Sequence, residues 1–292
     1  MDEAIALHTA ARRYCQERFS QWAEIYADLQ RKENWRVEKL FQPGWDYSDE
    51  AYRTFPRYRF AKSTQIEIER MLVDSGAKLD EMRMRLLAAS DVAHGSLRNE
   101  LTNKLAREAL REEAADFAVY LSALRLADLA QVKPLPHSRV LRKEESECLW
   151  NELRKSWAIG NGYWFPLKEG PISPGILAFH TDYFESIGGE ALLREALEQR
   201  GISRLFLLHE FGDPEYEVEL SIYSPGYRDG GEQYATSVQA DWMVYASHES
   251  SITVCGDWLT EFFRRSQPEC PERTYRGPYS TPDLRGTWET PK

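Results

Sequence analysis

Histidines and glutamates that could do chemistry gather in the second half of the chain. Two His-Glu pairs stand at 209–210 and 248–249, and a further histidine lies upstream. Neutral imidazole and carboxylate groups both bind zinc or iron, so a metal site could use His180, His209, His248 and Glu249. A metalloprotease helix needs a second histidine four residues on, which His209 lacks. The alternative is one histidine at each strand end, satisfied by hydrogen bonds or solvent.

Serines around His248 allow a second kind of catalytic site. Ser247, Ser250 or Ser251 could pair with His248, and Cys255 could pair with a histidine on a neighbouring strand. Nucleophile and base must lie within hydrogen-bond distance, and a third group must orient the base. Adjacent residues on one strand rarely meet this condition, and the chain has no Gly-x-Ser-x-Gly motif.

Three alternating glutamates form the most regular acidic pattern. Glu215, Glu217 and Glu219 share one face of a strand, because side chains repeat with a period of two. Such a row could bind Mg²⁺ or Ca²⁺, or act on a glycosidic bond. More often it is the solvated face of a sheet. The row could also serve as a docking surface for a basic partner, and the predicted contacts are then Asp213, Glu215, Glu217, Glu219 and Glu249.

A Gly-Gly pair at 188–189 precedes a predicted helix and could cradle a phosphate. The segment lacks the Lys and Ser/Thr of a P-loop, and Glu190 follows it. A turn is the preferred interpretation.

The charge distribution favours some partners over others. The net charge is −10, and residues 132–292 carry 17 Lys and Arg against 25 Asp and Glu. Residues 201–263 alone hold two Arg and eleven acids. This surface would repel a phosphate backbone, which disfavours nucleic acid, and it would attract a basic protein.

The composition is that of a globular protein. Of the 292 residues, 42% are hydrophobic and 12% aromatic, enough for a sizeable core. Four scattered cysteines predict free thiols, and no cofactor is expected. The acidic start and the absence of a long apolar run predict a soluble, cytoplasmic protein without a membrane segment.

The elements that would position these residues fall into two parts. Apolar stripes predict helices over 2–33, 62–90 and 97–130. Gly95-Ser96 is predicted to separate the second of these helices from the third. The intervening aromatics and arginines of 45–60 could stack nucleic-acid bases or pack a connector onto the helices, and packing is favoured. Residues 1–131 are therefore predicted to form an antiparallel helical bundle.

The second part alternates between helix and strand. Prolines at 134 and 136 predict a connector over 132–142. An α+β domain over 143–265 and an extended Pro-rich tail over 266–292 follow. Strands are predicted at 175–180, 204–211, 215–223, 242–247 and 252–255, and helices at 143–157, 182–200 and 257–265. The predicted fold class is α+β, an antiparallel helical bundle followed by a small, mainly antiparallel sheet flanked by helices.

Three functional hypotheses remain open. The stretch 241–256 resembles bacterial proteins of unassigned function, which implies no activity. The acidic charge favours a non-enzymatic bacterial binding protein of the immunity or antitoxin kind, which blocks a basic partner. The alternatives are a hydrolase or metal-dependent enzyme using the histidines, and a scaffold that self-associates through the helical half.

Overall fold

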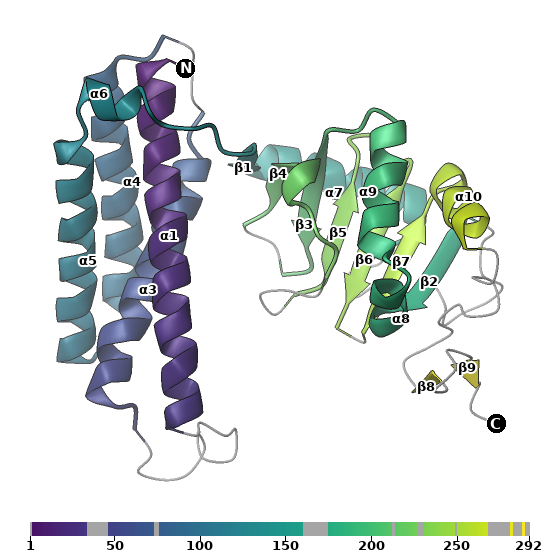
Figure 1. Ribbon diagram of the computed structural model, residues 1–292, viewed down its shortest axis with the longest axis horizontal. Coiled ribbons are helices and arrows are strands. Elements are labelled where there is room, and N and C mark those ends of the chain that lie inside the picture. Colours follow the sequence, from purple (N-terminus) through teal and green to yellow (C-terminus); the bar gives the residue numbers. More distant parts are fainter. Residues whose placement is uncertain are drawn as a thin grey trace. The chain divides into compact units, whose positions relative to one another are not determined.

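The computed structural model describes most of the chain as two compact units. The described residues are 2–33, 46–72, 76–159, 175–211, 214–226, 231–248 and 250–267, with the two short strands 281–282 and 288–289. The units are Met1–Leu135 and Pro136–Lys292 (Figure 1). Each is considered by itself below. The finer domain boundaries expected from the sequence stay a prediction.

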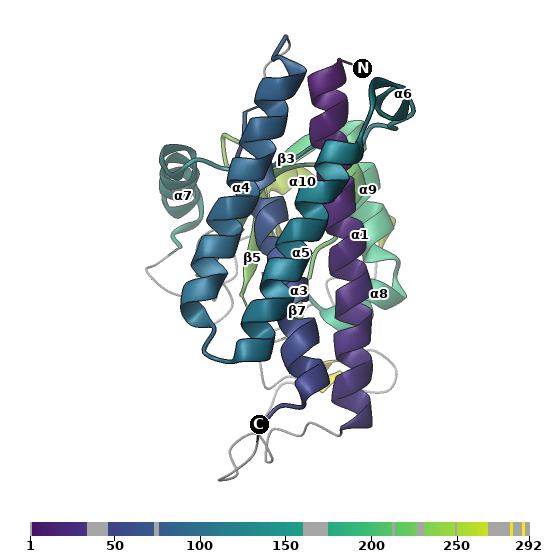
Figure 2. The same cartoon turned by 90° about the vertical axis from the view of Figure 1, so that its left-hand side faces the viewer.

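The first unit is an antiparallel bundle of long helices. Its helices are α1 (Glu3–Lys32), α3 (Asp49–Glu69), α4 (Leu79–Glu100), α5 (Lys104–Ala123) and the one-turn α6 (Leu126–Leu129). Figure 2 shows the four long helices side by side. No described helix is long and apolar enough to cross a membrane.

Several local predictions for this unit were wrong. The predicted helix 62–90 covers the end of α3 and the start of α4, and the predicted helix 97–130 covers the end of α4 together with α5 and α6. The aromatic and arginine-rich stretch 45–60 is not a connector, because α3 already begins at Asp49. Its rings do pack on the bundle, with Tyr58 stacked on Phe19 at 4.8 Å between ring centroids. Gly95 lies inside α4 and does not separate two helices.

A buried carboxylate joins three of the long helices. Glu113 of α5 is fully buried, and both of its oxygens accept hydrogen bonds of 2.6 Å from Arg18 of α1. Trp22 of α1 donates to it at 3.1 Å, and Arg57 of α3 at 3.2 Å. A buried charge is tolerated only when it is paired and hydrogen-bonded, so Glu113 fixes how α1, α3 and α5 meet.

The second unit is a seven-stranded antiparallel sheet in the order β1-β4-β3-β5-β6-β7-β2. The strands are β1 (Ser138–Val140), β2 (Ile176–His180), β3 (Arg204–His209), β4 (Tyr216–Glu219), β5 (Gln233–Thr236), β6 (Met243–Ser247) and β7 (Ser251–Cys255). Its helices are α7 (Lys143–Trp157), α8 (Thr181–Ser186), α9 (Gly189–Gln199) and α10 (Asp257–Ser266). A 3-10 turn follows β4 at Leu220–Ile222, and β8 (Thr281–Pro282) pairs with β9 (Trp288–Glu289).

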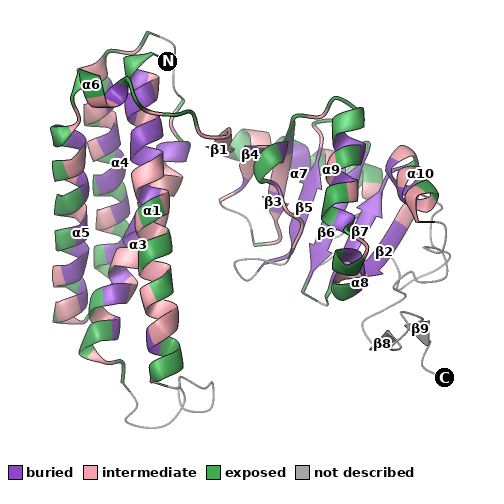
Figure 3. Ribbon diagram, viewed as in Figure 1, coloured by how far each residue is buried: buried purple, intermediate pink, exposed green. Residues whose placement is uncertain are grey.

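Helices cover both faces of the sheet. Helix α7 packs on one face through Leu149 and Leu153. Helices α8, α9 and α10 pack on the other face (Figure 1). As a result every residue of β6 and β7 is buried, which Figure 3 shows as continuous purple strands. Any polar side chain on these strands must therefore find its partner inside the protein.

The predicted fold class is confirmed, with differences in detail. Helix α7 has the predicted bounds, and both predicted hairpins, β3–β4 and β6–β7, are present. The predicted helix 182–200 is divided into α8 and α9, and the predicted strand 215–223 ends at Glu219. Strands β1 and β5 were not predicted, and β1 lies inside the expected connector.

Removing the carboxylate of Glu113 should destabilise the bundle. We expect Glu113→Ala to lower the free energy of unfolding by about 3 kcal/mol, because two guanidinium groups lose their shared partner in a buried setting. Urea unfolding followed by far-UV circular dichroism measures this. The control is Glu112→Ala, since the Glu112 side chain is 63% exposed and its loss should cost about 0.5 kcal/mol. Equal losses for the two variants would contradict the assigned role of Glu113.

Candidate functional site

The first of the three alternating glutamates is not on a solvated face. Glu215 is only 3% exposed, so the expectation of solvation is wrong for this residue. Its carboxylate accepts hydrogen bonds from Ser146 and from Trp150 Nε1 of α7, the latter at 2.7 Å. The backbone N–H of His209 also donates to it, at 3.3 Å. Glu215 therefore anchors α7 to the sheet.

The other two glutamates are also paired within the protein. Glu217 accepts hydrogen bonds from Arg139 Nη2 at 3.0 Å and from the ring of His137 at 3.2 Å. Burial raises the pKa of Glu217, but these two partners outweigh it and hold the pKa below its usual value. Glu219 accepts from the backbone N–H of His137 at 3.1 Å and from Ser221 at 2.6 Å. The row thus attaches β1 to the sheet.

The remaining predicted contacts, Asp213 and Glu249, lie outside the described residues. They stay predicted contacts of a basic partner.

The three predicted histidines lie at separate places on the sheet. His180 ends β2 and accepts a hydrogen bond from the backbone N–H of Asp182, which caps α8. His209 ends β3, and its ring bonds to the carbonyl of Pro214 at 3.0 Å. Strands β5, β6 and β7 lie between β3 and β2, so these two histidines are about 19 Å apart at four strand spacings. They cannot share a metal ion. Within the part of the chain that is described, no three His, Cys, Asp or Glu residues are grouped to hold one.

The Gly-Gly pair has a structural explanation. Gly188 has a φ of 66°, a left-handed conformation that glycine adopts without strain. A Cβ atom on Gly189 would lie 2.6 Å from the ring of Phe184, so only glycine lets α9 begin against that ring. The pair therefore makes the turn between α8 and α9, as the sequence favoured.

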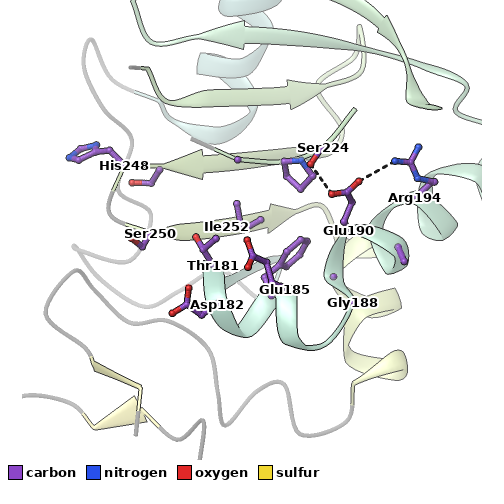
Figure 4. A pocket seen from close by; sticks show the side chains of 16 residues that line it. Thr181, Asp182, Glu185, Gly188, Glu190, Arg194, Ser224, His248, Ser250 and Ile252 are labelled. Atoms are coloured by element: carbon purple, nitrogen blue, oxygen red, sulfur yellow. Dashed lines mark hydrogen bonds and ion pairs between the residues drawn. The ribbon is translucent and has the colours of Figure 1, made fainter. Parts of the chain in front are cut away.

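The same turn borders a pocket of about 780 Å³. Helices α8 and α9, residues 224–226 and the turn between β6 and β7 line it. Three carboxylates are in its lining, those of Asp182, Glu185 and Glu190. Figure 4 shows the first two on α8 and Glu190 farther along, bonded to Ser224 and Arg194. We call this feature the acid-lined pocket.

Arg194 is the one Lys or Arg among the described residues of the lining, and it is already paired. It donates to the carbonyls of Leu220 and Tyr223, at 2.7 and 3.2 Å. It also donates to Glu190 at 3.2 Å. Because its guanidinium is engaged, it offsets only one of the three carboxylates, and the lining keeps an excess of negative charge.

Sequence reasoning missed the residue that organises the end of β6. Glu232, next to β5, is fully buried, and the ring Nδ1 of His248 lies 2.7 Å from its Oε1. Tyr245 and Ser247 of β6 also donate to the carboxylate of Glu232, the second at 3.1 Å. The sequence placed His248 in a candidate site with His180, His209 and Glu249, and Glu232 was not among the candidates. The sequence offered one clue to Glu232, an acidic residue directly before a strand. That clue could not be used because strand β5 itself was not predicted.

The acid sensitivity of the β1–α7 contact gives a test of this region. Burial raises the pKa of Glu145, but hydrogen bonds from Arg139 and Arg142 outweigh it and lower the pKa to about 2, from an ordinary value of 4.5. A depressed pKa stabilises the fold above pH 4.5, and this contribution is lost as the pH falls toward 2. We expect the urea midpoint of the wild type to fall more steeply over that range than the midpoint of Glu145→Gln.

The control for this experiment is Glu144→Gln, which removes an exposed carboxylate one residue away. Its midpoint should follow the wild type at each pH. A wild-type slope equal to that of Glu145→Gln would show that the carboxylate is not stabilised by its arginine partners.

No protein-family model matches this chain, and no curated protein or solved structure is significantly similar to it. A proposal about function therefore rests on the residues themselves. Two arrangements at the same end of the second unit carry the chemistry, the acid-lined pocket and the hydrogen-bond network of Glu232.

Proposed function

We propose that this chain is a cytoplasmic binding protein of the immunity or antitoxin kind, and that its acid-lined pocket receives a basic side chain of a protein partner. The observation that supports this proposal is the unbalanced charge of the pocket. Asp182, Glu185 and Glu190 line it, and the guanidinium of Arg194 is already held by Glu190 and two carbonyls.

The chemistry of the pocket favours an arginine or a lysine as the occupant. The carboxylate of Asp182 is on a side chain that is 84% exposed, and Glu185 is exposed as well. Asp182 Oδ2 lies 3.8 Å from Nδ1 of His180, which is too long for a hydrogen bond. Both carboxylates can therefore accept hydrogen bonds from a guanidinium or ammonium group. Charge-assisted hydrogen bonds of this kind are about twice as strong as neutral ones. A pocket of about 780 Å³ is in the range that holds a small ligand or a few side chains.

The proposed contact surface differs from the row of glutamates on β4 that the sequence suggested. The carboxylates of Glu215, Glu217 and Glu219 are engaged with α7, β1 and neighbouring residues, and a partner would have to displace those bonds. The excess acid of residues 132–292 still attracts a basic partner over a distance. Association should therefore slow as salt screens the charges.

Binding of a fluorescein-labelled hexa-arginine peptide, followed by fluorescence anisotropy, tests the pocket. We expect the double variant Asp182→Asn, Glu185→Gln to bind about 5- to 30-fold more weakly than the wild type. Each exposed charge pair contributes about 0.5–1 kcal/mol, and tenfold in affinity corresponds to about 1.4 kcal/mol.

The control removes the same charge from α9 outside the pocket. Glu195→Gln, Glu198→Gln should bind within about twofold of the wild type, since the remaining effect is long-range and screened. If both double variants lose affinity equally, the peptide responds to overall charge and the pocket is not its site. The absence of saturable binding by the wild type would contradict the proposal altogether.

A further inference from the structure

Aromatic residues line a small cavity at one end of the helical bundle. The cavity has a volume of about 180 Å³, and it lies where the end of α1, the start of α3 and the connection from α4 to α5 meet. Four of its lining residues are aromatic, Tyr26, Tyr47, Tyr52 and Phe55. Sites for drug-sized ligands usually exceed about 300 Å³, so this cavity suits a single small chemical group.

The rings stand at angles to one another, as the walls of a cage do. Tyr47 and Tyr52 are inclined by 74°, with 5.8 Å between ring centroids. Tyr26 of α1 and Phe55 of α3 have centroids 5.3 Å apart and are inclined by 31°. Rings from two helices and from the segment before α3 therefore contribute to one wall. The face of an aromatic ring carries partial negative charge, so a wall of this composition favours a positively charged group.

The charges around the cavity point the same way. The guanidinium of Arg59 lies 5.6 Å from the centroid of Phe55, so the protein already places one cation against this cluster. Its charge is offset by Glu100, which lines the cavity and pairs with it at 2.7 Å. Residues 46–53 carry three acids against one arginine. One of these acids, Asp46, accepts a hydrogen bond from the hydroxyl of Tyr52, which makes that ring more electron-rich.

The wall favours a methylated cation over a bare ammonium group. An ammonium group has three N–H donors, and each needs an acceptor when the group leaves water. Two strong acceptors in the wall are already engaged, because Glu100 binds Arg59 and the side-chain oxygen of Asn103 caps α5. The lining also includes two alanines, a proline and a leucine. A quaternary ammonium group has no donors to satisfy, and its methyl groups can pack against such a surface.

We propose that this cavity is a binding site for a trimethylammonium group. The site belongs to the first unit, so it goes beyond the proposed partner binding of the second unit and does not depend on it. The group occurs in small molecules such as choline and in trimethylated lysine side chains. Both sources present the same charge and the same methyl groups to the rings, and cation–π attraction is strongest when the cation is removed from water.

Isothermal titration calorimetry with the full chain tests the site. Choline is compared with 3,3-dimethyl-1-butanol, which has the same shape but a carbon in place of the charged nitrogen. We expect the neutral alcohol to bind at least about tenfold more weakly, because it lacks the cation–π attraction. Equal affinities would overturn the proposal, since the cavity would then recognise only an apolar group.

The amino acid Nε-trimethyllysine is the second probe and separates the two sources of the group. Saturable binding of choline alone supports a small-molecule ligand, and binding of trimethyllysine alone supports a modified protein side chain. The absence of saturable binding by both cations overturns the proposal.

Substitutions at Tyr47 locate the binding and have a matched control. This side chain is 40% exposed, so Tyr47→Leu removes a ring while leaving the core of the bundle intact. We expect it to bind the cation about 3- to 10-fold more weakly, whereas Tyr47→Phe, which keeps the ring, stays within about twofold of the wild type. The control is Phe211→Leu, which removes a ring that is 78% exposed from the second unit and should have no effect. Equal losses for the leucine variants at 47 and 211, or wild-type affinity in Tyr47→Leu, would overturn the assignment to this cavity.

Discussion

The burial of carboxylates is the constraint on which both units depend. Glu113, Glu215 and Glu232 are each 3% exposed or less, although an unpaired charge in such a position costs several kcal/mol. Each is tolerated because it draws donors from more than one element. Glu113 gathers arginines from two helices, Glu215 gathers a serine and a tryptophan from α7, and Glu232 gathers three residues from β6 and its turn. These hydrogen bonds fix which residues of neighbouring elements lie opposite one another. Apolar packing alone is less directional and fixes this less precisely.

Much of the fold could be predicted because its patterns are local. The long apolar stripe predicts helix α1, and the two prolines before β1 predict the break between the helical part and the sheet. The helical start of α3 could not be predicted in this way. The run of aromatic rings and arginines suggests a connector, yet α3 continues through it. Even Pro56 lies inside the helix, where the packing of the rings on α1 outweighs the missing backbone donor. Strand β5 is only four residues long and has no clear alternation, so its signal is weak.

The site was harder to predict than the fold, because its partners are distant in the sequence. Alternation correctly put Glu215, Glu217 and Glu219 in one row, but it could not show that α7 and β1 would cover that row. His248 was singled out for its neighbours, whereas its acid partner is 16 residues earlier. Only the pairing of β5 with β6 brings the two together. Geometry of this kind depends on strand register, which residue types do not encode.

That register has a consequence for how the chain tolerates changes in length. Side chains alternate between the two faces of a strand, so a slip of one residue between β5 and β6 would carry Glu232 from the α7 face to the α9 face. Residues 237–242 connect the two strands, so the length of this connection fixes which residues of β5 and β6 are paired and keeps Glu232 beside its partners. An insertion there that shifted the pairing would leave a charged group among the apolar residues of the opposite core. Substitutions can accumulate in this connection more readily than insertions or deletions.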